Sequence, residues 1–252
     1  MNIKLKHLFL PLTLLFCSLS VSSLPQNNAI SAEQIMTYLE SVYKKSNSYS
    51  DTGLEKTTFF TVDGVRTSER PFATDFIRFK KFRFEFAFKH PFPFAKLKRT
   101  IIVKNENGVI QWQNHDLGED KKGIHKEKSL GLAIAGATGI SGGSAYTMPS
   151  LLGVKGVGGW KNKLIDYNEI LRIEDGVLNG VTYYRINATY RGKKDKTKSK
   201  SRVLWVNKTT YLIHRIDSDH QFPEFRTESI TTYSPFVNND IKDSRFILNN
   251  DI

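Results

Sequence analysis

The chain has 252 residues, of which 39% are hydrophobic, so it is long enough to bury a sizeable core within one domain. Its single cysteine, Cys17, excludes an internal disulfide bond and a thiolate metal site. The formal net charge of +12 indicates attraction to an acidic partner, either an anionic membrane or a nucleic acid. No module that combines stacking aromatic residues with basic residues occurs, so nucleic acid is not an expected partner.

The first 23 residues are typical of a secretory signal peptide. Lys4 and Lys6 supply a positively charged start, an apolar run extends from Leu8 to Leu19, and small residues follow it. The run is short for a membrane span, and an uncleaved N-terminal anchor is the alternative. We therefore expect residues 1–23 to be removed and residues 24–252 to form a single periplasmic domain.

One helix and a series of strands are predicted after the signal peptide. Ser31 and Gln34 form a capping box, and apolar residues recur at helical spacing from Ile35 to Tyr43. After Tyr49 the pattern changes to short runs rich in Phe, Thr, Val and Ile, separated by turn signals. The predicted strands are Phe82–Phe88, Leu97–Lys104, Val109–Gln113, Leu164–Ile173, Thr182–Tyr190, Arg202–Val206, Tyr211–Asp217 and Phe225–Thr232. Because most connections are short, we expect an antiparallel meander.

The clearest strand has one face made only of phenylalanines, which are Phe82, Phe84, Phe86 and Phe88. The opposite face carries Arg83, Glu85 and Ala87. The phenylalanine face therefore either belongs to the core or binds an apolar molecule.

Residues 129–159 interrupt this strand pattern. They are rich in glycine and apolar residues, and Lys155 is their only charged residue. Leu130–Ala137 and Met148–Leu152 could form short helices, and the glycines make the connections between them pliable. Such an insert could be a lid over a curved sheet or an ordinary crossover that fills the core, and the sequence leaves both open.

Two further patterns suggest chemistry only weakly. Gly139–Gly143 satisfies the G-x-S-x-G pattern of a nucleophile elbow around Ser141, with His214 downstream. That elbow needs a buried strand before the serine, but the preceding residues are rich in alanine and glycine, and no alternating βα pattern occurs. His214 and His220 are the only closely spaced histidines, and their spacing matches no metal motif.

A strongly basic segment extends from Arg191 to Arg202 between two predicted strands. It is either a solvated hairpin tip or a contact for anionic lipid headgroups or an acidic partner protein. Its lysines are Lys193, Lys194, Lys196, Lys198 and Lys200.

The last third of the chain contains Leu204–Ile216, LWVNKTTYLIHRI, followed by Thr232–Pro235 and later by Phe246. These motifs resemble the LolA/LolB-like lipoprotein-carrier superfamily, especially its exported "outer membrane lipoprotein-sorting protein-like" branch. A W-[IV]-[DN]-x-x-T-x-L-x-x-R hairpin and a closing Y-x-P-x-x-N…F segment recur in that branch. Phe82–Glu85 and Ile140–Leu152 are similar to the same branch.

The resemblance implies an α+β, mainly β fold: a strongly curved antiparallel half-barrel. Its N-terminal helix and short helices from the insert would cover the concave face, where acyl chains would sit. We predict a non-enzymatic periplasmic binding or carrier protein for an acyl chain, a lipid or a lipidated protein, with no cofactor and no metal. The predicted ligand-binding residues are Phe82, Phe84, Phe86, Phe88, Trp112, Ile134, Leu151, Leu152 and Trp160.

Two alternatives stay open. One is an envelope structural or regulatory module that fills its own concavity and binds a partner protein or an anionic membrane surface. The other is a secreted serine hydrolase that uses Ser141.

Overall fold

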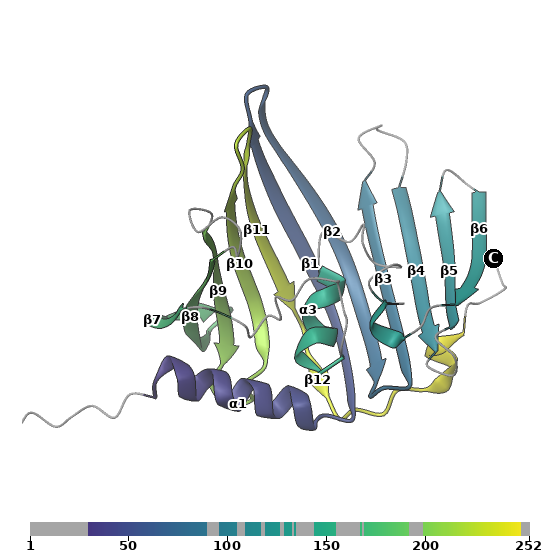
Figure 1. Cartoon of the computed structure of the whole chain (residues 1–252), viewed down its shortest axis with the longest axis horizontal. Helices are drawn as coiled ribbons and strands as arrows, with labels where there is room; N and C mark the ends of the chain where they lie inside the picture. Colours follow the sequence, from purple (N-terminus) through teal and green to yellow (C-terminus); the bar gives the residue numbers. More distant parts are fainter. Residues whose placement is uncertain are drawn as a thin grey trace, which may run out of the picture.

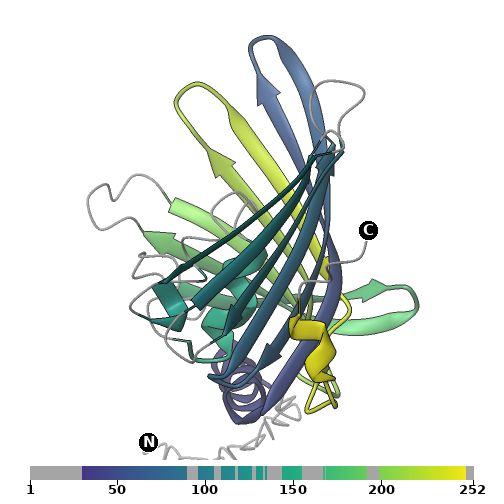
Figure 2. The ribbon, with the colours of Figure 1, turned by 90° about the vertical axis from the view of Figure 1, so that its right-hand side faces the viewer.

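The computed structural model describes residues 30–89, 96–104, 109–116, 119–126, 129–132, 134, 144–154, 167, 169–191 and 199–247. The predicted signal peptide lies outside these residues. The described part is one antiparallel sheet that curves around helices α1 and α3, while the short helix η1 lies on the opposite, convex side (Figures 1 and 2). The predicted fold class is therefore confirmed.

Two meanders form the sheet. Their strands are β1 Ser48–Thr61, β2 Gly64–Ile77, β3 Lys81–Lys89, β4 Lys96–Lys104, β5 Val109–Asp116, β6 Glu119–Lys126, β7 Glu169–Leu178, β8 Val181–Arg191, β9 Ser199–Asn207, β10 Ile213–Gln221, β11 Arg226–Tyr233 and β12 Phe236–Val237. The spatial order is β6-β5-β4-β3-β2-β1-β11-β10-β9-β8-β7, and β12 pairs with β1. The pairing of β1 with β11 thus joins the two meanders, and β6 and β7 form the two edges.

Helix α1 (Ala32–Lys45) begins where the capping box predicts. The Gln34 backbone N–H donates to Ser31 Oγ at 3.2 Å, and the Ser31 N–H donates to Gln34 Oε1 at 2.9 Å. Ile35 and Leu39 are fully buried under the sheet. The Ile213 N–H donates to the buried Tyr43 hydroxyl at 3.1 Å, which fixes the helix to the start of β10.

Replacing Ser31 with alanine is expected to lower the free energy of unfolding by about 1 kcal/mol, because the first turn of α1 loses its side-chain acceptor. Urea denaturation followed by circular dichroism measures the change. Ser31→Asp is the matched control, since aspartate can cap the same N–H group. Equal stability of the alanine variant and the wild type would contradict this role.

Helix α3 (Ser144–Leu151) crosses the concave face because of the strand order. Residues 127–168 connect β6 to β7, which are opposite edges of the sheet, so this connection has to cross from one edge to the other. Figure 1 shows α3 in front of β1 and β2. Met148, Leu151 and Leu152 are buried against the sheet. The helix predicted at Met148–Leu152 is present, but it begins earlier, at Ser144.

The convex side carries the C-terminal segment. Helix η1 (Asp243–Phe246) buries Phe246 there, and Arg245 forms two contacts with the Asp75 carboxylate at 2.7 and 2.9 Å. Lys81 of β3 pairs with Asp243 at 2.8 Å. These contacts hold η1 against β2 and β3.

Several strands differ from the prediction. Strands β1, β2 and β12 were not among the predicted strands, and β5 and β9 are longer than Val109–Gln113 and Arg202–Val206. Strand β6 was not predicted, because EDKKGIHK has no apolar alternation, yet it pairs with β5. Strand β7 starts at Glu169 and continues past Ile173 through a register shift before Gly176, so the prediction of Leu164–Ile173 ended too early. Strand β10 starts at Ile213 rather than Tyr211, because Tyr211 has a φ of 56° and ends a turn.

Candidate functional site

The phenylalanines of β3 lie on the concave face. Phe82, Phe84 and Phe86 expose at most 2% of their surface. Neighbouring ring centroids along the strand are 6.3 and 5.6 Å apart. Phe72 of β2 extends this row, with its ring 6.0 Å from Phe84 and 5.5 Å from Tyr233 of β11. The result is a continuous aromatic surface from β3 to β11.

The insert covers the same surface. Ile134, Leu151 and Leu152 belong to one buried cluster with the β3 phenylalanines. The structure thus brings together six of the nine predicted ligand-binding residues. The side chains of Phe88 and Trp112, and all of Trp160, lie outside the described residues. Whether these residues bind a ligand stays a prediction.

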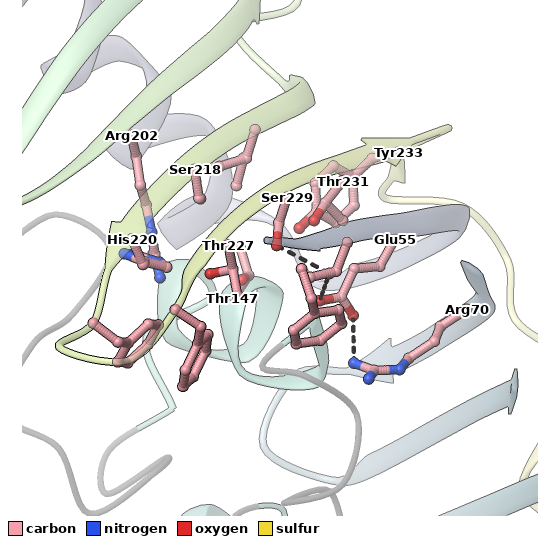
Figure 3. Close-up of a pocket in the computed structure, with 15 residues that line it drawn as sticks. Glu55, Arg70, Thr147, Arg202, Ser218, His220, Thr227, Ser229, Thr231 and Tyr233 are labelled. Carbon is pink, nitrogen blue, oxygen red and sulfur yellow. Dashed lines mark hydrogen bonds and ion pairs between the residues drawn. The ribbon is translucent and has the colours of Figure 1, made fainter. Parts of the chain in front are cut away.

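A cavity of about 380 Å³ adjoins this cluster (Figure 3). Strands β1, β2, β9, β10 and β11 and helix α3 contribute to its walls. Its polar lining consists of Glu55, Thr57, Arg70, Thr147, Arg202, Ser218, His220, Thr227, Ser229 and Thr231, and its apolar or aromatic lining of Phe59, Ile216, Phe222, Phe225 and Tyr233. The volume falls within the range of small-molecule pockets. No polar residue of this lining had been predicted to bind a ligand.

The cavity and the apolar cluster share two residues of the sheet. Ile216 and Tyr233 line the cavity and also belong to the buried cluster. At another part of the wall, Phe222 and Phe225 stack with ring centroids 4.4 Å apart, and Phe222 is 36% exposed. A molecule in the cavity would therefore touch polar groups and apolar side chains at the same time.

Glu55 is the acid of this cavity. It is 5% exposed, and burial raises the pKa of its carboxyl group above the ordinary value. Arg70 Nη1 lies 3.7 Å from Glu55 Oε2, and the Thr57 hydroxyl donates to Glu55 Oε1 over a long 3.5 Å. A shorter contact, 2.9 Å, joins the Thr57 and Ser229 hydroxyls across the β1–β11 junction.

The structure gives no support to the serine hydrolase alternative. Ser141 lies outside the described residues. Every strand pairing in the described part is antiparallel, whereas a nucleophile elbow belongs to a mostly parallel α/β sheet. The His214 ring lies 5.3 Å from the Tyr183 ring, and burial lowers its pKa. Histidine, cysteine and acidic side chains of the described residues form no group of three that could hold a metal ion.

The basic segment overlaps both neighbouring strands, because β8 ends at Arg191 and β9 begins at Ser199, earlier than the predicted Arg202. Residues 192–198 and the side chain of Lys200 lie outside the described part. Contact of its lysines with an anionic membrane surface therefore stays a prediction.

None of the helices in the described part of the chain has the length and apolarity needed to cross a membrane.

No family model matches the chain, and no protein of curated function matches it. Several solved structures are similar. LprF from Mycobacterium bovis is 10% identical, with a TM-score of 0.47 over 84% of this chain and 94% of that one. A LolA superfamily protein from Nitrosomonas europaea is 10% identical, with a TM-score of 0.33 over 87% and 99% of the two chains.

A putative outer membrane lipoprotein-sorting protein domain from Vibrio parahaemolyticus is also 10% identical, with a TM-score of 0.32 over 85% of this chain and 97% of that one. The superfamily that the sequence resembles thus occurs among the structural matches.

Proposed function

We propose that the chain is an exported, non-enzymatic carrier that binds a hydrophobic ligand, namely an acyl chain, a lipid or a lipidated protein, on its concave face. The observation that carries this proposal is the cavity of about 380 Å³ whose wall shares Ile216 and Tyr233 with the buried apolar cluster beneath α3. Enclosing one acyl chain against such a surface contributes several kcal/mol, at about 25 cal/mol per Å² of apolar area.

The position of α3 supports this role. The helix lies over the aromatic surface, and Met148 and Leu151 of α3 and Leu152 directly after it belong to the buried apolar cluster. The Arg78 guanidinium also donates to the Leu152 carbonyl oxygen at 2.9 Å and holds the end of this segment. An acyl chain would therefore replace the apolar side-chain contacts of Met148 and Leu151 and leave this hydrogen bond in place. The ligand would extend from the cavity along the row formed by Tyr233, Phe72 and Phe84.

The test is native mass spectrometry, with lipid extraction, of the protein purified from an envelope fraction without detergent. We expect a stoichiometric acyl-containing species on the wild type. Leu151→Glu should abolish it, because a charge would stand where the acyl chain lies. Leu132→Glu is the matched control, since Leu132 belongs to the same insert but is 43% exposed. Circular dichroism verifies that both variants fold.

One observation favours the second candidate, a structural or regulatory envelope module. Phe82, Phe84 and Leu152 are 0% exposed, so protein atoms already cover that part of the concave face. If the wild type gives a clean apo mass and stays without ligand when lysolipids are offered, the carrier proposal fails. The module that binds a partner protein or an anionic membrane surface then becomes the better account.

A further inference from the structure

Glu55 is a buried carboxylate that faces the cavity with too few partners. Its side chain is 6% exposed, and its Oε2 atom accepts no hydrogen bond from the described residues. The ion pair with Arg70 spans 3.7 Å, which is longer than a charged hydrogen bond. An under-satisfied buried carboxylate is costly, so its presence in a cavity wall needs a physical reason.

The strand itself does not supply that reason. The side chains of Tyr49 and Thr57 lie on the same concave side of β1 as Glu55. The exposed Lys56 and the half-buried Thr58 belong to the other side, where they line a separate hollow. A glutamate needed only for solubility would serve on the convex side, in water. On the concave side it stands among hydroxyl groups, next to Thr57 and near Ser229.

Figure 3 shows how charge is distributed around this cavity. Glu55 and Arg70 lie on one side, Arg202 and His220 lie on the other, and the hydroxyl-bearing residues Thr227 and Ser229 lie between them. Arg70 balances the charge of Glu55, so the wall around Glu55 attracts no anion. Thr57 donates to Glu55 Oε1, but no group of the described residues donates a hydrogen bond to Oε2.

We infer that the cavity is the subsite for the polar head of an amphiphilic ligand, and that this head donates a hydrogen bond from an N–H or O–H group to Glu55. The inference rests on the proposed function, because the acyl part of the same molecule would lie on the aromatic surface beyond Tyr233. A headgroup without a donor leaves Glu55 under-satisfied and is discriminated against.

The experiment compares lysophosphatidylethanolamine with lysophosphatidylcholine, both with a lauroyl chain, by isothermal titration calorimetry below their critical micelle concentrations. The ammonium of the first lipid donates hydrogen bonds, and the quaternary ammonium of the second does not. We expect the wild type to bind the first about tenfold more tightly, the effect of one hydrogen bond to a charged group. Glu55→Gln should reduce this preference to about twofold or less.

Lys56→Gln is the matched control, because Lys56 is adjacent in β1 but lies on the opposite face with its side chain 51% exposed. It should keep the full preference. Monolauroylglycerol, which offers hydroxyl donors without a charge, separates the two kinds of donor. If Glu55→Gln weakens the binding of monolauroylglycerol alone, the donor is a hydroxyl group. If it weakens the binding of both monolauroylglycerol and lysophosphatidylethanolamine, either donor is accepted.

Two different results would overturn the inference, and they separate failure of the headgroup subsite from failure of the carrier function. If all three lipids bind and Glu55→Gln changes none of the affinities, the headgroup subsite is wrong while the carrier function stands. If none of the three binds the wild type, the proposed function itself fails. A purely structural Glu55 would lower the stability of Glu55→Gln without changing the ratio between the two lysophospholipids.

Discussion

Replacing Gly53 with alanine is expected to lower the free energy of unfolding by about 3 kcal/mol. Gly53 faces the concave side of β1 opposite Tyr233 of β11. A Cβ atom at this position would overlap the Phe72 ring and the backbone carbonyl oxygen of Thr232. The ring cannot simply turn aside, because it packs between Phe84 and Tyr233, and the carbonyl belongs to the neighbouring strand.

The size of this effect follows from the place of Gly53 in the sheet. The pairing of β1 with β11 is the junction between the two meanders, so moving Thr232 away from β1 would open the sheet at its centre. Urea denaturation followed by circular dichroism measures the loss. Thr52→Ala, at the exposed neighbouring position, should change stability by about 0.5 kcal/mol at most. Equal stabilities of Gly53→Ala and Thr52→Ala would show that the junction can relax.

Elements whose structure is decided by residues close together in the sequence could be predicted. The capping box of α1 needs only Ser31 and Gln34, and the phenylalanine face of β3 needs only the period of two along a strand. Strands without apolar alternation could not be found this way. In β6 the charged residues of EDKKGIHK hide the strand, and its pairing with β5 decides its structure instead.

The strand order could not be predicted, because it depends on a pairing between distant parts of the chain. Nothing local in β1 indicates that Gly53 pairs opposite Tyr233 rather than with a residue of its own meander. This one pairing places β6 and β7 at opposite edges and makes the insert cross the concave face. The sequence therefore left open whether the insert is a lid or a crossover. In the described part of the insert, Ile134 and α3 cover the face on which the ligand is predicted to bind.

The apolar part of the candidate site could be predicted, and the polar part was missed. Phe82 and Phe84 belong to an alternating apolar pattern, and Leu151 lies in a segment with almost no charged residues. Both patterns predict burial. Glu55 and Arg70 are charged residues on strands, and such residues normally face water. A signal was nevertheless present: Glu55 is six residues after Tyr49 in one strand, and residues an even number apart share a face. A buried Tyr49 therefore implies a concave-facing Glu55.

Asp51 lies between these two residues on the same face of β1 and makes stability depend on pH. It is 5% exposed, and the Tyr49 hydroxyl donates to its Oδ2 atom at 2.6 Å. Desolvation by burial raises the pKa of Asp51 to about 7, and the nearby Asp75 adds to the effect, while hydrogen bonds from Tyr49 and Thr74 oppose it. At neutral pH the folded protein therefore carries a partly protonated carboxyl group in its core.

The direction of the effect follows from the two pKa values. In the unfolded chain the pKa of an aspartate is about 3.9, so between about pH 4 and pH 7 the unfolded chain has released a proton that the folded protein keeps. The contribution of Asp51 to stability is fully present below about pH 4, falls as the pH rises to about 7, and is constant above that. The difference amounts to about 4 kcal/mol across the window, at about 1.4 kcal/mol per pKa unit.

Asp51→Asn should remove this dependence, because the amide is neutral at every pH and its oxygen can still accept from Tyr49. We expect the variant to exceed the wild type by about 2 kcal/mol at pH 8, less than the full difference because one acceptor is lost. Below about pH 4 the order should reverse or vanish. Urea denaturation between pH 4 and pH 8.5 measures both profiles, with Asp63→Asn in the exposed β1–β2 turn as the control. If Asp51→Asn kept the slope of the wild type between about pH 4 and pH 7, the proton would belong to another group. A slope over this window that is smaller in Asp51→Asn than in the wild type would instead show that this buried carboxyl on the concave face makes stability depend on pH.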